Sequence, residues 1–137
     1  MQYREGELIQ LRCEDIIEAP IENASVVVMN YTLQFIPLAK RTGLLRRIHQ
    51  AMRPGDALIL SEKLVFPDAN LNNYFIELHH EFKRQQGYSD LEIARKREAL
   101  EDVLIAETQQ THLERLTQVG FSRADVWFQC MNFASLI

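Results

Sequence analysis

The feature that most constrains the fold is a strand–helix–strand pattern between residues 26 and 62. Residues 26–31 form a β-branched run without polar alternation, and residues 57–62 form a second apolar run. Such runs are typical of parallel strands that are buried on both faces. Between them, a helical pattern begins at Pro37 and stops at Pro54 and Gly55. Because parallel neighbours need a long crossover connection, the pattern predicts an α/β sheet.

The helical segment after Pro37 also predicts which of its side chains enter the core. Apolar residues at spacings of three and four are expected on the buried side: Leu38, Leu44, Leu45, Ile48, Ala51 and Met52. Four cations are expected to point outward: Lys40, Arg41, Arg46 and Arg47.

Residues on either side of this pattern predict further elements. We expect a strand over residues 8–13 and a loop over residues 16–25. Three helices should follow: from Asp68 to about Gly87, from the N-cap Ser89 to about Val103, and from about Thr108 to Val119, ended by Gly120. The apolar side of the first of these consists of Leu71, Phe75, Leu78 and Phe82. Residues 124–130 and 133–137 predict two strands, joined into a hairpin at Met131 and Asn132.

Composition limits the class of protein. A chain of 137 residues with 47% hydrophobic residues can bury the core of one domain. A net charge of −4 argues against a dominant basic face for nucleic acid, and two distant cysteines, Cys13 and Cys130, argue against a disulfide framework or a zinc site. The first seven residues lack the apolar region of a signal peptide, and no apolar run reaches the roughly 18–20 residues of a membrane span. We therefore expect a cytoplasmic protein without a membrane segment.

Polar residues follow the first two predicted strands. Asp15 comes after residues 8–13, and Asn30 lies at the end of residues 26–31. In open α/β sheets the ligand crevice lies outside the carboxyl ends of the strands, where short polar side chains can bind a nucleobase or an amino-acid group. Both residues are also common at element ends, where Asp15 would cap a turn and Asn30 would terminate a strand. The spacing alone leaves both interpretations open.

The cluster Arg95, Lys96 and Arg97 has two interpretations as well. An arginine can grip a carboxylate through two parallel hydrogen bonds, which a lysine cannot. Nearby acids at helical spacing would instead pair with these cations on a solvated face: Glu92, Glu98 and Glu101.

Neither the histidines nor the aromatic residues indicate a reaction. His79 and His80 are adjacent, so on a helix they point about 100° apart and cannot readily share one ion. The spacing H-E-x-x-H is absent, and we expect no metal site. Trp127, Phe128 and Phe133 could stack a base, although aromatic residues on strands are more often core. The scattered glycines contain no G-x-G-x-x-G, so no loop that cradles a cofactor is recognisable.

Several blocks of the sequence, in order, resemble one family. They are residues 22–35 (ENASVVVMNYTLQF), 60–63 (LSEK), 79–84 (HHEFKR), 87–93 (GYSDLEI) and 127–133 (WFQCMNF). Together they resemble the tRNA wobble-uridine carboxymethyltransferases, which use carboxy-S-adenosylmethionine and are class I S-adenosylmethionine-dependent methyltransferases. The resemblance implies part of a Rossmann-like sheet with helices on its faces and a C-terminal antiparallel hairpin.

The resemblance also implies roles for four residues. Asp15 and Ile16 match positions that hold the adenine end of the cofactor, and Asn30 matches a residue that faces its amino-acid and sulfonium region. Arg97 matches the arginine that clamps the extra carboxylate of carboxy-S-adenosylmethionine. By the same resemblance, the substrate would be a tRNA anticodon stem-loop, with S-adenosylmethionine as the lesser candidate for the donor. We also expect a homodimer, for a reason that lies in the strand over residues 26–30. No general base is indicated.

The chain departs from the family's pattern at its beginning. The first strand with its glycine-rich turn, the second strand and the N-terminal helices have no counterpart here, so residues 1–137 are expected to form a single, truncated domain. The edge of the strand over residues 26–30 would then be bare. We expect either that residues 8–13 cover this edge or that two copies associate there. A non-catalytic dimerisation or interaction module is the alternative to a transferase.

Overall fold

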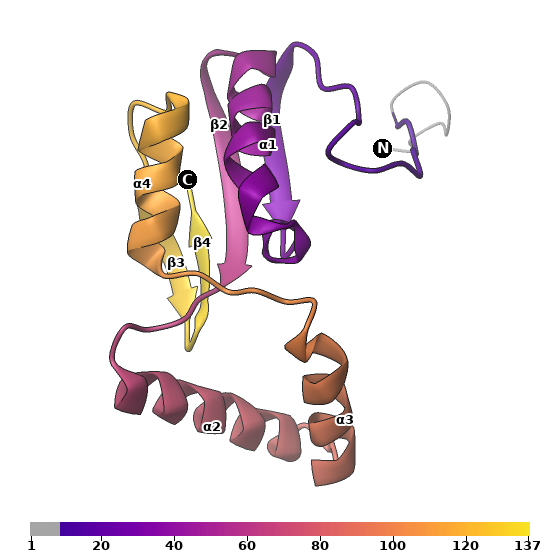
Figure 1. The fold of residues 1–137 in the computed structure, drawn as a ribbon, viewed down its shortest axis with the longest axis vertical. Coiled ribbons are helices and arrows are strands. Elements are labelled where there is room, and N and C mark those ends of the chain that lie inside the picture. The colour runs from indigo at the N-terminus through magenta and orange to yellow at the C-terminus, as the bar shows by residue number, and fades with distance from the viewer. Residues whose placement is uncertain (1–8) are drawn as a thin grey trace, which may run out of the picture.

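A mixed sheet of four strands forms the centre of the described part of the chain (Figure 1). The computed structural model describes residues 9–137. The strands lie in the order β1 (Ala24–Asn30), β2 (Met52–Lys63), β4 (Phe133–Leu136) and β3 (Val126–Cys130). β1 and β2 are parallel, whereas β4 is antiparallel to both β2 and β3. The predicted α/β sheet and the C-terminal hairpin are confirmed.

The predicted helices are present, and the predicted caps Ser89 and Gly120 are confirmed. They are α1 (Leu38–Ala51), α2 (Ala69–Gln85), α3 (Asp90–Glu101) and α4 (Gln109–Val119), and a short 3-10 turn, η1 (Leu33–Phe35), precedes α1. The side chains of Asp68 and Thr108 accept hydrogen bonds from the first turns of α2 and α4. Ser89 and Glu92 form a reciprocal capping box at the start of α3, and Gly120, in the left-handed conformation, ends α4.

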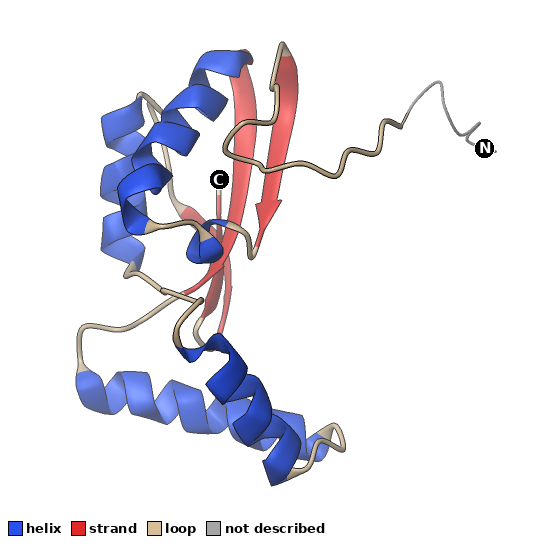
Figure 2. Ribbon diagram, turned by 45° about the vertical axis from the view of Figure 1, so that its right-hand side comes forward, coloured by secondary structure: helices blue, strands red, loops and turns tan. Residues whose placement is uncertain are grey.

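The core lies between one face of the sheet and the helices α1 and α4 (Figure 2). Its buried members come from β1, η1, α1, β2, α4 and β4: Met29, Leu33, Ile36, Leu44, Leu45, Ile48, Leu58, Leu60, Leu116, Val119 and Leu136. Within residues 9–137, none of the helices is both long and apolar enough to cross a membrane.

The prediction of a strand over residues 8–13 was wrong for residues 9–13, which are irregular, and residue 8 lies outside the described part. Leu11 is 94% exposed, and the segment pairs with no described strand, so its apolar residues gain no burial. The loop that follows is held by Arg47 of α1, whose guanidinium donates to the carbonyl oxygens of Ile16, Ile17 and Ala19. Arg47 was predicted to point outward to solvent, and this was wrong, because these carbonyl oxygens hold its guanidinium.

The strand β1 was expected to be buried on both faces, and this was also wrong. Val26 and Val28 are 57% and 54% exposed. β1 is the edge strand of the described sheet, and no described helix lies on the face opposite α1 and α4 (Figure 2). Trp127 and Phe128 of β3 are likewise exposed rather than core.

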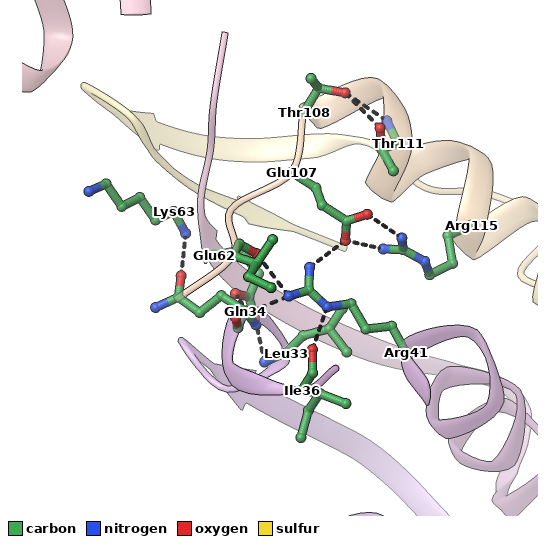
Figure 3. A network of polar contacts seen from close by, with 11 residues as sticks. Leu33, Gln34, Ile36, Arg41, Glu62, Lys63, Glu107, Thr108, Thr111 and Arg115 are labelled. Carbon is green, nitrogen blue, oxygen red and sulfur yellow. Dashed lines mark hydrogen bonds and ion pairs between the residues drawn. The ribbon is translucent and has the colours of Figure 1, made fainter. Parts of the chain in front are cut away.

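Arg41 was expected to face solvent, but its side chain is completely buried (Figure 3). Its guanidinium donates to the carboxylate of Glu107 at 2.5 Å and to the carbonyl oxygens of Ile36 at 2.8 Å, Ile105 at 2.8 Å and Gln34 at 3.0 Å. Glu107 also accepts two hydrogen bonds from Arg115 of α4. Four of the five N–H groups of Arg41 therefore have an oxygen partner, one of them a carboxylate, which makes burial of its charge tolerable. Leu38, expected inside, is half-exposed instead.

The helices α2 and α3 lie apart from the layer formed by α1 and α4, beyond the ends of β1 and β2 (Figure 1). The helix α2 contains the residues of the predicted apolar side, but this side is not packed into a core. Leu71, Leu78 and Phe82 are exposed, and none of the residues of α2 is buried. An apolar helix face of this kind is left without a covering element in the described chain.

The Arg41 network yields a stability prediction. Replacing Arg41 by Leu leaves the carboxylate of Glu107 with one arginine and deprives three carbonyl oxygens of a donor. We expect the free energy of unfolding, measured with urea, to fall by roughly 3–5 kcal/mol. The matched control is Arg46→Leu on the exposed side of the same helix, with an expected change of less than about 0.5 kcal/mol. Equal effects of the two substitutions would contradict the network's role.

His112 yields a pH-dependent prediction. It is 2% exposed, both ring nitrogens lack a hydrogen-bond partner, and burial lowers its pKa from 6.5 to about 4, with Glu107 opposing and Arg115 adding to the shift. Between pH 6.5 and 4 the unfolded chain therefore binds a proton that the folded chain does not, so stability falls as the pH falls. His112→Leu should remove this loss, on the order of 3 kcal/mol at about 1.4 kcal/mol per pKa unit. Urea unfolding at pH 7.5 and pH 4.5 should show that the difference in the free energy of unfolding, variant minus parent, is larger at pH 4.5. An equal difference at the two pH values would contradict the assignment of the acid-induced loss of stability to His112.

Candidate functional site

A cavity of about 530 Å³ lies where the carboxyl ends of β1 and β2 meet α2 and α3. Tyr31 and Lys63, which directly follow or end the two parallel strands, form one wall. The opposite walls carry His79 and Lys83 of α2 and Arg97 of α3. This is the position at which open α/β sheets bind their ligands.

Helical and strand geometry explain why these side chains converge. His79 and Lys83 are four residues apart on α2 and therefore share a face. Tyr31 has a φ of 52°, a left-handed conformation that turns the chain sharply after β1, and its N–H donates to the carbonyl oxygen of Ser61 on β2 at 2.7 Å. The ring of Phe133 contacts both Tyr31 and His79 edge-on, at centroid distances of 5.9 and 4.8 Å.

The cavity is strongly cationic. Lys63, Lys83, Lys96 and Arg97 line it, against a single acid, Glu101. Burial, reinforced by Lys83 and Arg97, lowers the pKa of Lys63, and burial together with the charges of Lys83 and Lys63 lowers the pKa of His79 to about 4. The positive charges thus destabilise one another in the absence of an anion. An anionic ligand would relieve this repulsion, so the geometry and charge fit an anion.

A buried network holds the wall formed by the turn after β1 (Figure 3). The carboxylate of Glu62 accepts the N–H groups of Leu33 at 2.9 Å and Gln34 at 3.0 Å. Glu62 is completely buried, and this burial raises its pKa to about 7, although the two N–H groups and Arg41 act in the opposite direction. The side-chain oxygen of Gln34 in turn accepts the N–H of Lys63 at 3.0 Å. The turn and the end of β2 are therefore fixed relative to each other.

Of the four site residues predicted from the sequence, Arg97 is the one that lines this cavity within the described chain. Its side chain is exposed on α3 and forms no ion pair with the neighbouring acids among residues 9–137. Asn30 is the last residue of β1, one position before Tyr31, and stands beside Ser61 of β2. Asp15 and Ile16 lie in the irregular segment before β1, where the Asp15 carboxylate accepts the N–H of Ile17 at 2.9 Å. The structure brings Asn30 near the cavity but does not bring Asp15 and Ile16 to it.

Sequence reasoning missed the contribution of Lys63, Lys83 and His79. The histidines had been considered for a metal site, and His79 instead lines the cavity against the ring of Phe133. Two signals in the sequence could have identified the cations. Lys63 directly follows a buried strand, and Lys83 lies one helical turn after His79. Among residues 9–137, no three His, Cys, Asp or Glu side chains are grouped closely enough to hold a metal ion.

A larger cavity, of about 760 Å³, lies at the opposite end of the sheet. It is bordered by His49, Met52, Gly120, Phe121 and Ile137, and its arginine Arg53 is paired with Asp56 at 3.1 Å. This end is the amino end of the parallel strands, away from the ligand edge of such sheets. Its lining holds two arginines, Arg53 and Arg123, and one acid, Asp56, so it is less cationic than the cavity that Arg97 lines. The cationic cavity is therefore the better candidate.

Comparison with known proteins identifies close relatives. No family model matches the chain. It is 57% identical over 128 residues to the carboxy-S-adenosyl-L-methionine synthase of Hahella chejuensis, covering 93% of this chain and 52% of that protein. It is 58% identical over 129 residues to the synthase of the same name from Geobacter metallireducens, covering 94% of this chain and 53% of the relative. The chain thus spans about half the length of the curated relatives that it matches.

Solved structures show the same fold at low sequence identity. Human N-acetylserotonin methyltransferase in complex with S-adenosylmethionine aligns with 91% of this chain and 32% of its own, with a TM-score of 0.59 and 15% identity. PigF with S-adenosylhomocysteine aligns with 89% of this chain and 32% of its own, with a TM-score of 0.56 and 18% identity. This chain is therefore homologous to the carboxy-S-adenosyl-L-methionine synthases over about half of their length. Its fold is that of S-adenosylmethionine-dependent methyltransferases.

Proposed function

We propose that this chain is the carboxylate-binding half of an enzyme that forms carboxy-S-adenosyl-L-methionine. The observation that supports the proposal most directly is the cationic cavity at the carboxyl ends of β1 and β2, with Arg97 in its wall. The names of the relatives suggest carboxy-S-adenosyl-L-methionine as the ligand. The positive charges of the cavity give a reason why this chain would bind the carboxylate of that ligand.

The chemistry of the ligand fits the cavity. Carboxy-S-adenosylmethionine carries a carboxylate on the carbon attached to its sulfonium, and Arg97 can bind this group through two parallel hydrogen bonds. The ordinary methyl donor would bring its positive sulfonium to a wall with three lysines and an arginine, where Glu101 is the one acid to offset them. The extra carboxylate supplies a further negative charge, so the cavity should favour the carboxylated form.

The remaining predicted contacts belong to the same proposal. Asn30, at the end of β1, would face the amino-acid and sulfonium region, next to the cavity that Tyr31 lines. Asp15 and Ile16 would hold the adenine end, which requires the segment before β1 to lie along the same edge of the sheet. Forming the product also requires removal of a proton from the methyl carbon, and we assign no residue to this step.

We propose that the enzyme forms carboxy-S-adenosylmethionine rather than transferring its carboxymethyl group to another molecule. The resemblance in the sequence had suggested transfer of the carboxymethyl group to a tRNA wobble uridine, whereas the relatives are named for making carboxy-S-adenosylmethionine. Transfer to the anticodon stem-loop and a cytoplasmic location stay predictions. Homodimerisation also stays a proposal, and the exposed apolar side of α2 supports it.

Calorimetric titration of the chain with carboxy-S-adenosylmethionine and with S-adenosylmethionine tests the proposal. We expect micromolar binding of the carboxylated form and weaker binding of the ordinary form. Arg97→Ala should weaken binding of the carboxylated form by about 10- to 100-fold, the loss of a charge-assisted pair of hydrogen bonds. The matched control is Arg95→Ala, two residues away on α3 and outside the cavity lining, which should leave the affinity unchanged.

Two outcomes would count against this function. Absence of heat at millimolar carboxy-S-adenosylmethionine would favour the alternative of a non-catalytic interaction module. Tighter binding of ordinary S-adenosylmethionine would contradict the role of the cationic wall.

The charge of the cavity can also be tested without ligand. After burial, the charge of Lys83 does most to lower the pKa of His79, so Lys83→Ala should raise that pKa from about 4 towards 6.5. The pKa can be followed by NMR titration of the imidazole C–H signals. Lys40→Ala, exposed on α1, is the control and should not move the His79 titration. An unchanged His79 pKa in Lys83→Ala would contradict a close approach of the Lys83 charge to the imidazole.

A further inference from the structure

We propose that the side-chain amide of Gln34 is a further ligand-binding group, which donates a hydrogen bond from Nε2 to the carboxylate that Arg97 binds. This inference rests on the proposed function, because it assigns a second protein donor to the same ligand group. Gln34 lies in η1 and lines the cavity together with Arg97.

The orientation of the amide follows from a hydrogen bond inside the protein. The backbone N–H of Lys63 donates to Oε1 of Gln34 at 3.0 Å. Since a backbone N–H can only donate, the oxygen of the amide must face Lys63, and the NH₂ group must form the other end. Figure 3 shows this oxygen directed at Lys63 and the amide nitrogen directed away from the network.

The amide nitrogen has no partner within the described residues. No hydrogen bond from Nε2 of Gln34 is formed there, although the residue is only 5% exposed. Nε2 is also not among the side-chain atoms that are sealed from solvent without a partner. A nearly buried donor that is still accessible, in a residue lining a cavity, is a group that a ligand can satisfy.

The backbone of Gln34 is held on both sides, so the amide is fixed before any ligand binds. Its N–H donates to Glu62 at 3.0 Å, and its carbonyl oxygen accepts from Arg41 and from the N–H of Ile105, each at 3.0 Å. Little side-chain freedom remains to be lost on binding, and this favours affinity.

A neutral donor suits this cavity better than another cation would. The cations Lys63, Lys83 and Arg97 already repel one another, as the lowered pKa of Lys63 indicates. An amide adds N–H groups for the second oxygen or second lone pair of a carboxylate without adding to the repulsion.

Gln34→Glu tests the inference with almost no change of shape. One carboxylate oxygen can still accept from Lys63, while the other replaces the donor with an anionic acceptor that repels the ligand's carboxylate. We expect calorimetry to show that the affinity for carboxy-S-adenosylmethionine falls about 10- to 100-fold. The affinity for S-adenosylmethionine should not fall, so the preference between the two ligands collapses.

Gln34→Met is a second variant, which removes the donor without adding charge and should weaken only the carboxylated ligand, by about tenfold. The matched control for the added charge is Gln50→Glu, exposed on α1, which should leave both affinities unchanged. A purely structural role for Gln34 would weaken both ligands together and would overturn the inference.

The outcomes separate this inference from the proposed function. If the parent chain binds carboxy-S-adenosylmethionine and Arg97→Ala loses it, but both Gln34 variants keep the parent's preference, the inference is wrong and the proposed function stands. If the parent chain binds neither ligand, the proposed function fails, and the inference fails with it.

Discussion

The buried guanidinium of Arg41 is the interaction on which most of the described structure depends. It joins the turn after β1 to the segment before α4, and these two parts of the chain are more than sixty residues apart. The carboxylate of Glu107 accepts hydrogen bonds from both Arg41 and Arg115. The backbone of Glu107 also forms a parallel β-bridge with Leu64, where the chain leaves β2 for α2. One residue, through its carboxylate and its backbone, thereby ties α1, α4 and both connections of the α2–α3 pair together.

This arrangement explains how a cavity forms between parts that share little packing. The sheet contributes Tyr31 and Lys63, and the α2–α3 pair contributes Lys83 and Arg97, yet α2 buries none of its residues. The hydrogen bonds of Glu62, Gln34 and Arg41 fix the sheet side of the cavity, because they join η1 to β2 and to α1. Among residues 9–137 the cations of this cavity form no ion pair, which leaves their charge available to a ligand.

The sequence predicted the elements well because their signals are local. Periodicity, the N-cap Ser89 and the helix end at Gly120 depend on residues within one or two turns, and all are present. Burial was predicted poorly where it depends on distant partners. Arg41 is buried because Glu107 and three carbonyl oxygens surround it, and Val26 and Val28 are exposed because nothing in the described chain covers that face. For the site, Arg97 could be proposed from resemblance, but Lys63, Lys83 and Gln34 become neighbours only through the fold.

The bare face of the sheet carries a natural spectroscopic reporter. The chain has a single tryptophan, Trp127, which is 62% exposed on β3 and whose indole N–H donates to Ser135 at 2.9 Å. Ser135 is bonded in turn to Ser61 on β2, directly before Glu62 and Lys63. Indole emission shifts to shorter wavelength when water leaves the ring, so the intrinsic fluorescence of this protein records any polypeptide that comes to cover the uncovered face, with no label added.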